Sequence, residues 1–119
     1  MNPAHFITPH KLLTVAAGVE LATGLALLFT PGLVSHVLLG IDGTEVTNLF
    51  ARFFGLALIA LGIACWPRPA STAAVRAMQT YNGAIALYLA YVGVFVGSGL
   101  LLWPAVVFHG VMTALLLRR

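Results

Sequence analysis

Four apolar runs, separated by prolines, glycines and polar residues, constrain the fold of this chain more than any other feature. An α-helix rises about 1.5 Å per residue, so about 20 apolar residues cross the ~30 Å hydrocarbon core of a bilayer. The runs have about this length and predict helices over about 9–30, 48–66, 73–96 and 100–118. The sequence therefore predicts an all-α fold, an integral membrane four-helix up-down-up-down bundle that forms one transmembrane domain over 1–119.

The composition agrees with a membrane protein and argues against several other classes. Hydrophobic residues make up 61% of the 119 residues and charged residues 8%, which is too little charge to cover a water-soluble domain. The formal net charge is +3 and the basic residues are not clustered, so we expect no nucleic-acid partner. The single cysteine, Cys65, allows neither an intramolecular disulfide nor a cysteine zinc site.

Capping residues mark where two of these helices begin. Thr8 followed by Pro9 is typical of a helix start, because threonine caps free backbone N–H groups and proline fits the first helical position. Pro31 ends the first helix. Ser71 or Thr72 can cap the third helix.

The residues between the helices predict the orientation of the chain. Cytoplasmic loops of membrane proteins carry an excess of Lys and Arg. The basic residues of one side are Lys11, Arg68, Arg76, Arg118 and Arg119. The opposite connection, 31–47, carries Asp42 and Glu45, and its segment 33–39 could form a short interfacial helix. We therefore expect a multi-pass protein of a bacterial-type inner membrane, with both termini in the cytoplasm.

Small residues predict where the helices touch. Lipid tails are as apolar as leucine, so helices in a bilayer associate through close packing at small residues and through polar contacts. Gly93 and Gly97 have the spacing of a GxxxG pair. The predicted helix-packing positions are Gly55, Gly62, Gly83, Gly93 and Gly97.

Polar residues inside the apolar runs are the candidates for a functional site. Counted from the cytoplasmic ends, Glu20, Asn82 and His109 fall at a similar depth, about 14 Å into the bilayer. Arg52 and Tyr88 lie some five residues, about 7 Å, further out, a gap that the long arginine side chain could close to reach Glu20. These five residues are the predicted ligand-binding residues.

Two interpretations of these polar residues are open. An ionised side chain at a helix centre costs about 2.5–3.5 kcal/mol, so Glu20 and Arg52 must be paired, neutralised or in contact with water. In the functional interpretation they form a site in which Glu20 and His109 pass protons and Arg52 holds an anionic or carbonyl group. In the structural interpretation Glu20 and Arg52 form an ion pair, and Asn82 and His109 complete a hydrogen-bonded clamp.

Cofactor chemistry receives little support from the sequence. A haem held by two histidines needs a second axial histidine on another span, and only His109 lies within a span, so we expect no haem. Tyr88 or Tyr91 could donate a hydrogen bond to a carbonyl, which makes a quinone or another lipophilic ligand the possible bound molecule. We predict neither a metal site nor a catalytic residue.

One segment suggests a family. The stretch 51–62, ARFFGLALIALG, together with the length and the four spans, resembles DoxX-like small four-helix membrane proteins. The resemblance implies a small membrane bundle, and it implies a role as a subunit of a membrane complex, because some members are subunits of oxidoreductase complexes linked to the quinone pool. It brings no catalytic residue with it.

The sequence favours two functions of different classes. The first is a small accessory or structural subunit of a larger inner-membrane complex, or a self-associating protein, with a link to quinone-dependent electron transfer. The second is a binder or carrier of a lipophilic small molecule, such as a quinone or an isoprenoid, in the bundle interior. An isomerase or reductase that uses Glu20 and His109 as a proton relay is a third hypothesis, and without a bound ligand we favour a non-enzymatic role.

Overall fold

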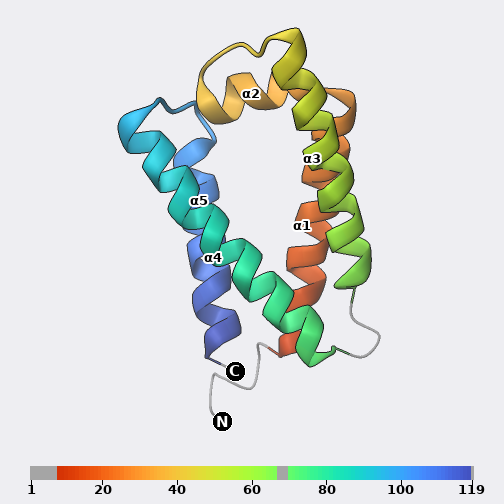
Figure 1. Cartoon of the computed structure of the whole chain (residues 1–119). Helices are drawn as coiled ribbons and strands as arrows, with labels where there is room; N and C mark the ends of the chain where they lie inside the picture. Colours follow the sequence, from red (N-terminus) through yellow and green to blue (C-terminus); the bar gives the residue numbers. More distant parts are fainter. Residues whose placement is uncertain (1–7, 67–69, 119) are drawn as a thin grey trace.

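The computed structural model describes residues 8–66 and 70–118, and within these residues the chain is all-α, with five helices and no strand (Figure 1). The all-α prediction is thereby confirmed. The helices are α1 (Pro9–Phe29), α2 (Pro31–Leu39), α3 (Glu45–Ala64), α4 (Thr72–Phe95) and α5 (Leu102–Leu117). The four long helices begin and end within a few residues of their predicted bounds, and α2 is the short helix expected in the connection 31–47.

Side-chain caps fix the starts of three helices. Thr8 accepts a hydrogen bond from the Lys11 backbone N–H at 3.2 Å, and Ser71 accepts one from the Ala74 N–H at 3.0 Å. α3 begins three residues before the predicted start, because Thr44 and Thr47 exchange side-chain to backbone hydrogen bonds of 3.2 and 2.7 Å. Threonine is not the usual residue at the second position of this motif, so the sequence pattern did not reveal it.

The four long helices form two pairs instead of one evenly packed bundle. α1 packs along α3, and α4 packs along α5, whereas contacts between the two pairs are few. Figure 1 shows the pairs close together at the end where α1 and α4 begin and further apart toward α2. The molecule therefore has a narrow end and an open end.

α2 crosses the open end and links the two pairs. It follows α1 directly, and its last turn meets the connection between α4 and α5: the backbone N–H groups of Gly99 and Leu101 donate to the carbonyls of Leu38 and Val37 at 3.0 and 2.8 Å. Gly40 ends α2 with a left-handed φ of 71°, a conformation that glycine adopts without strain. α2 thus spans the open end and is hydrogen-bonded to the connection between α4 and α5.

Glycines bring α1 and α3 into backbone contact. A Cβ atom added to Gly55 would lie 2.6 Å from the Gly24 carbonyl oxygen, and one added to Gly62 would lie 2.6 Å from Leu21 Cγ and 3.0 Å from the Ala17 carbonyl oxygen. Gly55, a predicted packing position, therefore lies where backbone leaves no room for a side chain, and at Gly62, also predicted, Leu21 would have to shift. Gly24, the partner of Gly55 on α1, was not among the predicted packing positions.

The other three predicted packing glycines differ from one another. A Cβ at Gly93 would lie 2.6 Å from Leu102 Cδ2 and 2.8 Å from the Trp103 ring of α5, so these side chains would have to shift. At Gly83 the nearest atom would be Thr113 Cγ2 at an ordinary 3.5 Å. Gly97 lies beyond the end of α4 and faces the Leu39 carbonyl of α2, so Gly93 and Gly97 do not form one helical GxxxG seam.

An apolar core joins the two pairs at the narrow end. It contains residues of α1, α4 and α5 together with Cys65, which follows α3. Its buried members are Leu12, Leu13, Ala16, Ala17, Cys65, Ala74, Val75, Met78, Met112 and Leu116. The core members from α1 all precede Glu20, so this core lies on the narrow-end side of Glu20.

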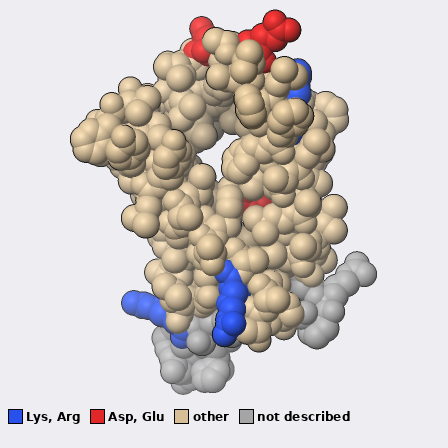
Figure 2. Space-filling view, in the orientation of Figure 1, with Lys and Arg blue, Asp and Glu red and all other residues tan. Residues whose placement is uncertain are grey.

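Charges lie mainly at the two ends of the molecule. Figure 2 shows Lys and Arg at the narrow end and Asp and Glu above α2, with one further basic region near the open end. By length and composition, α1 and α3 could each cross a membrane, and α5 is a shorter apolar helix. Many large apolar side chains on the outside are exposed, among them Phe53, Leu87 and Val94.

Candidate functional site

Glu20 is the acidic group at the centre of the candidate site. It lies on the largely apolar helix α1 and is only 1% exposed. The Tyr81 side chain of α4 hydrogen-bonds its carboxyl group. The other carboxyl oxygen, Oε1, is buried and has no hydrogen-bond partner among the described residues. Glu20 therefore lacks a donor at one of its two oxygens, which is costly for a buried carboxyl group.

Asn82 and His109 form the second part of the site and join α4 to α5. His109 Nδ1 and Asn82 Oδ1 are 2.7 Å apart, and Asn82 Nδ2 donates to the Met78 carbonyl at 2.9 Å. Because an amide oxygen only accepts, Nδ1 of the histidine must carry the proton in this hydrogen bond. The asparagine thus fixes the ring of His109 while its own orientation is fixed by its helix.

Tyr81 connects the two parts. Its ring meets the ring of His109 edge-on, with centroids 5.9 Å apart, and its side chain also bonds Glu20. Phe108 packs edge-on against the other side of His109 at 5.2 Å. The structure therefore brings together Glu20, Asn82 and His109, the three residues predicted to share one depth, through a tyrosine that the sequence analysis did not include in the site. Its position directly before Asn82 and its helical spacing of seven residues from Tyr88 were the available signals.

Arg52 is not part of this cluster, and the expected ion pair with Glu20 is not formed. The Arg52 side chain is exposed, and its Nε donates to the Leu28 carbonyl at 3.2 Å. This carbonyl belongs to the last turn of α1, where backbone oxygens lack partners within the helix and the helix dipole attracts a positive charge. The arginine therefore caps α1 instead of neutralising the acid, and the predicted clamp loses its cation.

Tyr88 also lies outside the hydrogen-bonded cluster. Its side chain is 63% exposed and stacks on Tyr91, with ring centroids 6.2 Å apart. Tyr91 in turn contacts Phe95 at 5.1 Å. Of the five predicted ligand-binding residues, three are thus brought together, while Arg52 and Tyr88 lie further out.

An opening lies between the two helix pairs above Glu20. Figure 2 shows this opening below α2, with acidic surface at its lower edge. The three helices α1, α4 and α5 contain no acidic residue other than Glu20. The buried carboxyl group is therefore the acidic group at the inner end of the opening.

One face of α4 lines the opening. Residues Tyr81, Ile85, Tyr88 and Val92 follow one another at steps of four, three and four, so they share one side of the helix. Because Tyr81 reaches Glu20 of α1, this side faces the α1–α3 pair. The exposed ring of Tyr88 therefore lies on the side of the opening, about two turns above Tyr81.

One face of α3 lines the opposite wall. Phe54, Leu58, Leu61 and Cys65 have the same spacing of four, three and four. At the narrow end this side faces α4, because Cys65 Sγ lies 3.7 Å from the Ala74 carbonyl. Phe54, which is 41% exposed, continues this side of α3 toward the open end. The walls are thus aromatic and aliphatic, and the polar groups lie at the inner end.

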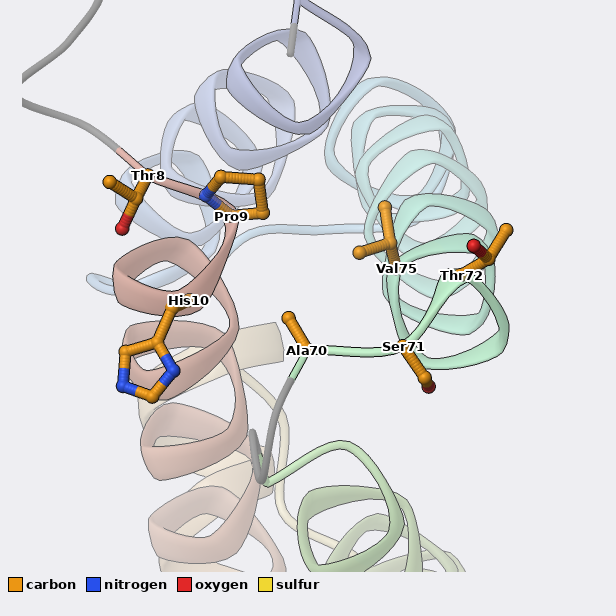
Figure 3. A pocket seen from close by; sticks show the side chains of 7 residues that line it. All are labelled: Thr8, Pro9, His10, Ala70, Ser71, Thr72 and Val75. Carbon is orange, nitrogen blue, oxygen red and sulfur yellow. The ribbon is translucent and has the colours of Figure 1, made fainter.

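A separate, shallow pocket lies at the narrow end between the beginnings of α1 and α4 (Figure 3). Its volume is about 340 Å³, and none of the predicted site residues lines it. It is lined by Thr8, Pro9, His10, Ala70, Ser71, Thr72 and Val75. In the described part of the chain, no three His, Cys, Asp or Glu side chains come close enough to hold a metal ion.

Comparison of the chain with protein-family models, with curated proteins and with solved structures finds no match. The resemblance to DoxX-like proteins accordingly stays an expectation from the sequence. The chemistry of the site has to be inferred from its own residues.

Proposed function

We propose that this chain is an integral membrane protein with four spanning helices that binds a lipophilic small molecule between its two helix pairs. The observation that carries the proposal is the opening above Glu20. Ligand sites are concave and mostly apolar, with a few polar groups that fix the orientation of the ligand. The opening lies between helices rich in apolar side chains, and Glu20 and Tyr81 join α1 to α4 on its inner side.

The surface and the charges support the membrane assignment. Exposed large apolar side chains around the helices, such as Leu87 at 77%, are stable in contact with acyl chains but not with water. Lys11 and Arg76 lie at the narrow end, and Asp42 and Glu45 lie near α2. Cytoplasmic loops of membrane proteins carry an excess of Lys and Arg. The narrow end therefore faces the cytoplasm, and α2 lies at the outer surface.

A lipophilic occupant follows from the surroundings of the opening. Protein interiors are closely packed, and an unfilled space costs the contacts that its lining side chains would make. In a bilayer, acyl chains and other lipophilic molecules are the available filling. A ligand with a polar head is favoured over a plain acyl chain, because Glu20 Oε1 lacks a hydrogen-bond donor.

An accessory subunit is the second candidate function. The exposed ladder of Tyr88, Tyr91 and Phe95 on the outer half of α4 supports it, because contiguous aromatic surface is typical of contacts between membrane proteins as well as of contacts with lipid. A link to quinone-dependent electron transfer would fit either function.

Native mass spectrometry of the protein, extracted gently from its membrane, tests the two functions in one measurement. We expect a stoichiometric non-phospholipid molecule bound to each chain. Ile85→Trp, which fills the opening, should remove this molecule, whereas Leu87→Trp, on the exposed side of α4, should keep it. A bound molecule retained by both variants, or phospholipid alone in the wild type, would overturn the binding site. A larger particle that lacks such a molecule would favour the accessory subunit.

A further inference from the structure

We propose that the ligand of the opening is a lipophilic amine, bound as its ammonium ion to the carboxyl group of Glu20. The inference rests on the proposed function and names the chemical class of the ligand. It is carried by three features of the site: the unpartnered oxygen of Glu20, the distance of every described basic side chain from it, and the aromatic residues along the opening.

The unpartnered oxygen of Glu20 can accept a hydrogen bond that no described residue donates. Glu20 Oε1 is buried without a hydrogen bond, while Tyr81 already bonds the carboxyl group. Asn82 does not supply this donor, because its amide nitrogen donates to the Met78 carbonyl and to Met78 Sδ. His109 does not supply it through Nδ1, because that nitrogen bonds Asn82 Oδ1. A bound molecule can supply this donor, and an ammonium group offers N–H donors together with the opposite charge.

No described basic residue takes the place of that cation. Arg52 is bound to the Leu28 carbonyl at 3.2 Å. Lys11 lies on α1 nine residues before Glu20, about 14 Å along the helix axis. Arg76 and Arg118 lie near the beginning of α4 and the end of α5, at the narrow end. Among residues 8–66 and 70–118 the acid therefore has no basic side chain as its counter-ion, and a cationic ligand complements it.

The walls of the opening suit a cation attached to an apolar body. The faces of tyrosine and phenylalanine rings attract cations, and this attraction strengthens where water is excluded. Tyr88 of α4 and Phe54 of α3 lie on the sides of their helices that face the opening. A lipophilic carboxylic acid or phosphate would instead bring a second negative charge toward Glu20. A quinone carbonyl would bring another acceptor to an oxygen that lacks a donor.

The test compares three probes of equal chain length: dodecylamine, dodecanol and dodecyl methyl ether. Each is titrated into the full-length protein in phosphatidylcholine nanodiscs, and bound probe per chain is counted by native mass spectrometry. The variants are Glu20→Gln, Glu20→Asp and, as a control that removes an acid outside the opening, Glu45→Gln. Circular dichroism and gel filtration establish that each variant is folded.

We expect one dodecylamine per chain, with binding weakened about tenfold or more by Glu20→Gln. Glu45→Gln should bind as the wild type, and Glu20→Asp should retain more binding than Glu20→Gln. Equal binding of the ether and the amine, or amine binding unaffected by Glu20→Gln, would overturn the amine assignment and leave the lipophile site intact. No binding of any probe would overturn both.

Discussion

Replacing Gly55 by leucine should separate α1 from α3 and leave little folded protein. At this position even a Cβ atom would lie 2.6 Å from the Gly24 carbonyl oxygen and 3.0 Å from Leu27 Cβ. The first of these contacts is with backbone, which cannot rotate aside as a side chain can. Overpacking of a well-packed site costs about 1–3 kcal/mol, and we expect a branched side chain here to exceed that range.

Fluorescence-detected gel filtration and thermal unfolding in mild detergent measure the effect. Gly110→Leu is the matched control, because a Cβ at Gly110 on α5 would meet nothing within 4 Å. It should unfold at nearly the wild-type temperature, and Gly55→Ala should lie between the two. If Gly55→Leu were as stable as Gly110→Leu, the close crossing of α1 and α3 would be wrong.

Cysteine labelling should divide the chain sharply between two sides of the membrane. Asp42→Cys lies at the open end before α3, and Ala73→Cys lies in the first turn of α4 at the narrow end; both positions are exposed. In a Cys65→Ala background, an impermeant maleimide added to right-side-out vesicles should label Asp42→Cys fully and leave Ala73→Cys unlabelled. Permeabilising the vesicles should expose Ala73→Cys.

The wild-type protein, which retains Cys65, is the control. Cys65 is 2% exposed, so the wild-type protein should resist the same maleimide before and after the vesicles are opened. The reverse pattern, with only Ala73→Cys labelled in sealed vesicles, would invert the orientation. Labelling of both positions from outside would contradict a membrane span between them.

The sequence predicted the helices well because their signals are local. The apolar runs, the Thr8 cap with Pro9 and the serine at Ser71 all act within a few residues, and the helices lie where they were expected, although only α1 and α3 are long and apolar enough to cross a membrane. The early start of α3 escaped notice because Thr47 replaces the usual glutamate or glutamine of a capping box. Depth along the helices was also predictable, since a fixed rise per residue placed Asn82 and His109 level with each other.

What the sequence could not supply was the direction in which each face points. Counting residues allowed Arg52 to reach Glu20, but its side chain is directed to the Leu28 carbonyl at the end of α1. Gly93 and Gly97 had the spacing of a helical pair, but α4 ends at Phe95, before the second glycine. The separation of the two pairs depends on contacts between distant segments, which no local pattern encodes.

The most direct test of a lipid-accessible opening above Glu20 is carboxyl labelling of the protein in a bilayer, read by peptide mass spectrometry. Asp42 and Glu45, exposed at the open end, are internal controls and should react with a water-soluble carbodiimide. Glu20 should react with the lipophilic dicyclohexylcarbodiimide and not with the water-soluble reagent, and Ile85→Trp should suppress its reaction. Labelling of Glu20 by the water-soluble reagent, or no labelling of Glu20 by the lipophilic one, would contradict the account.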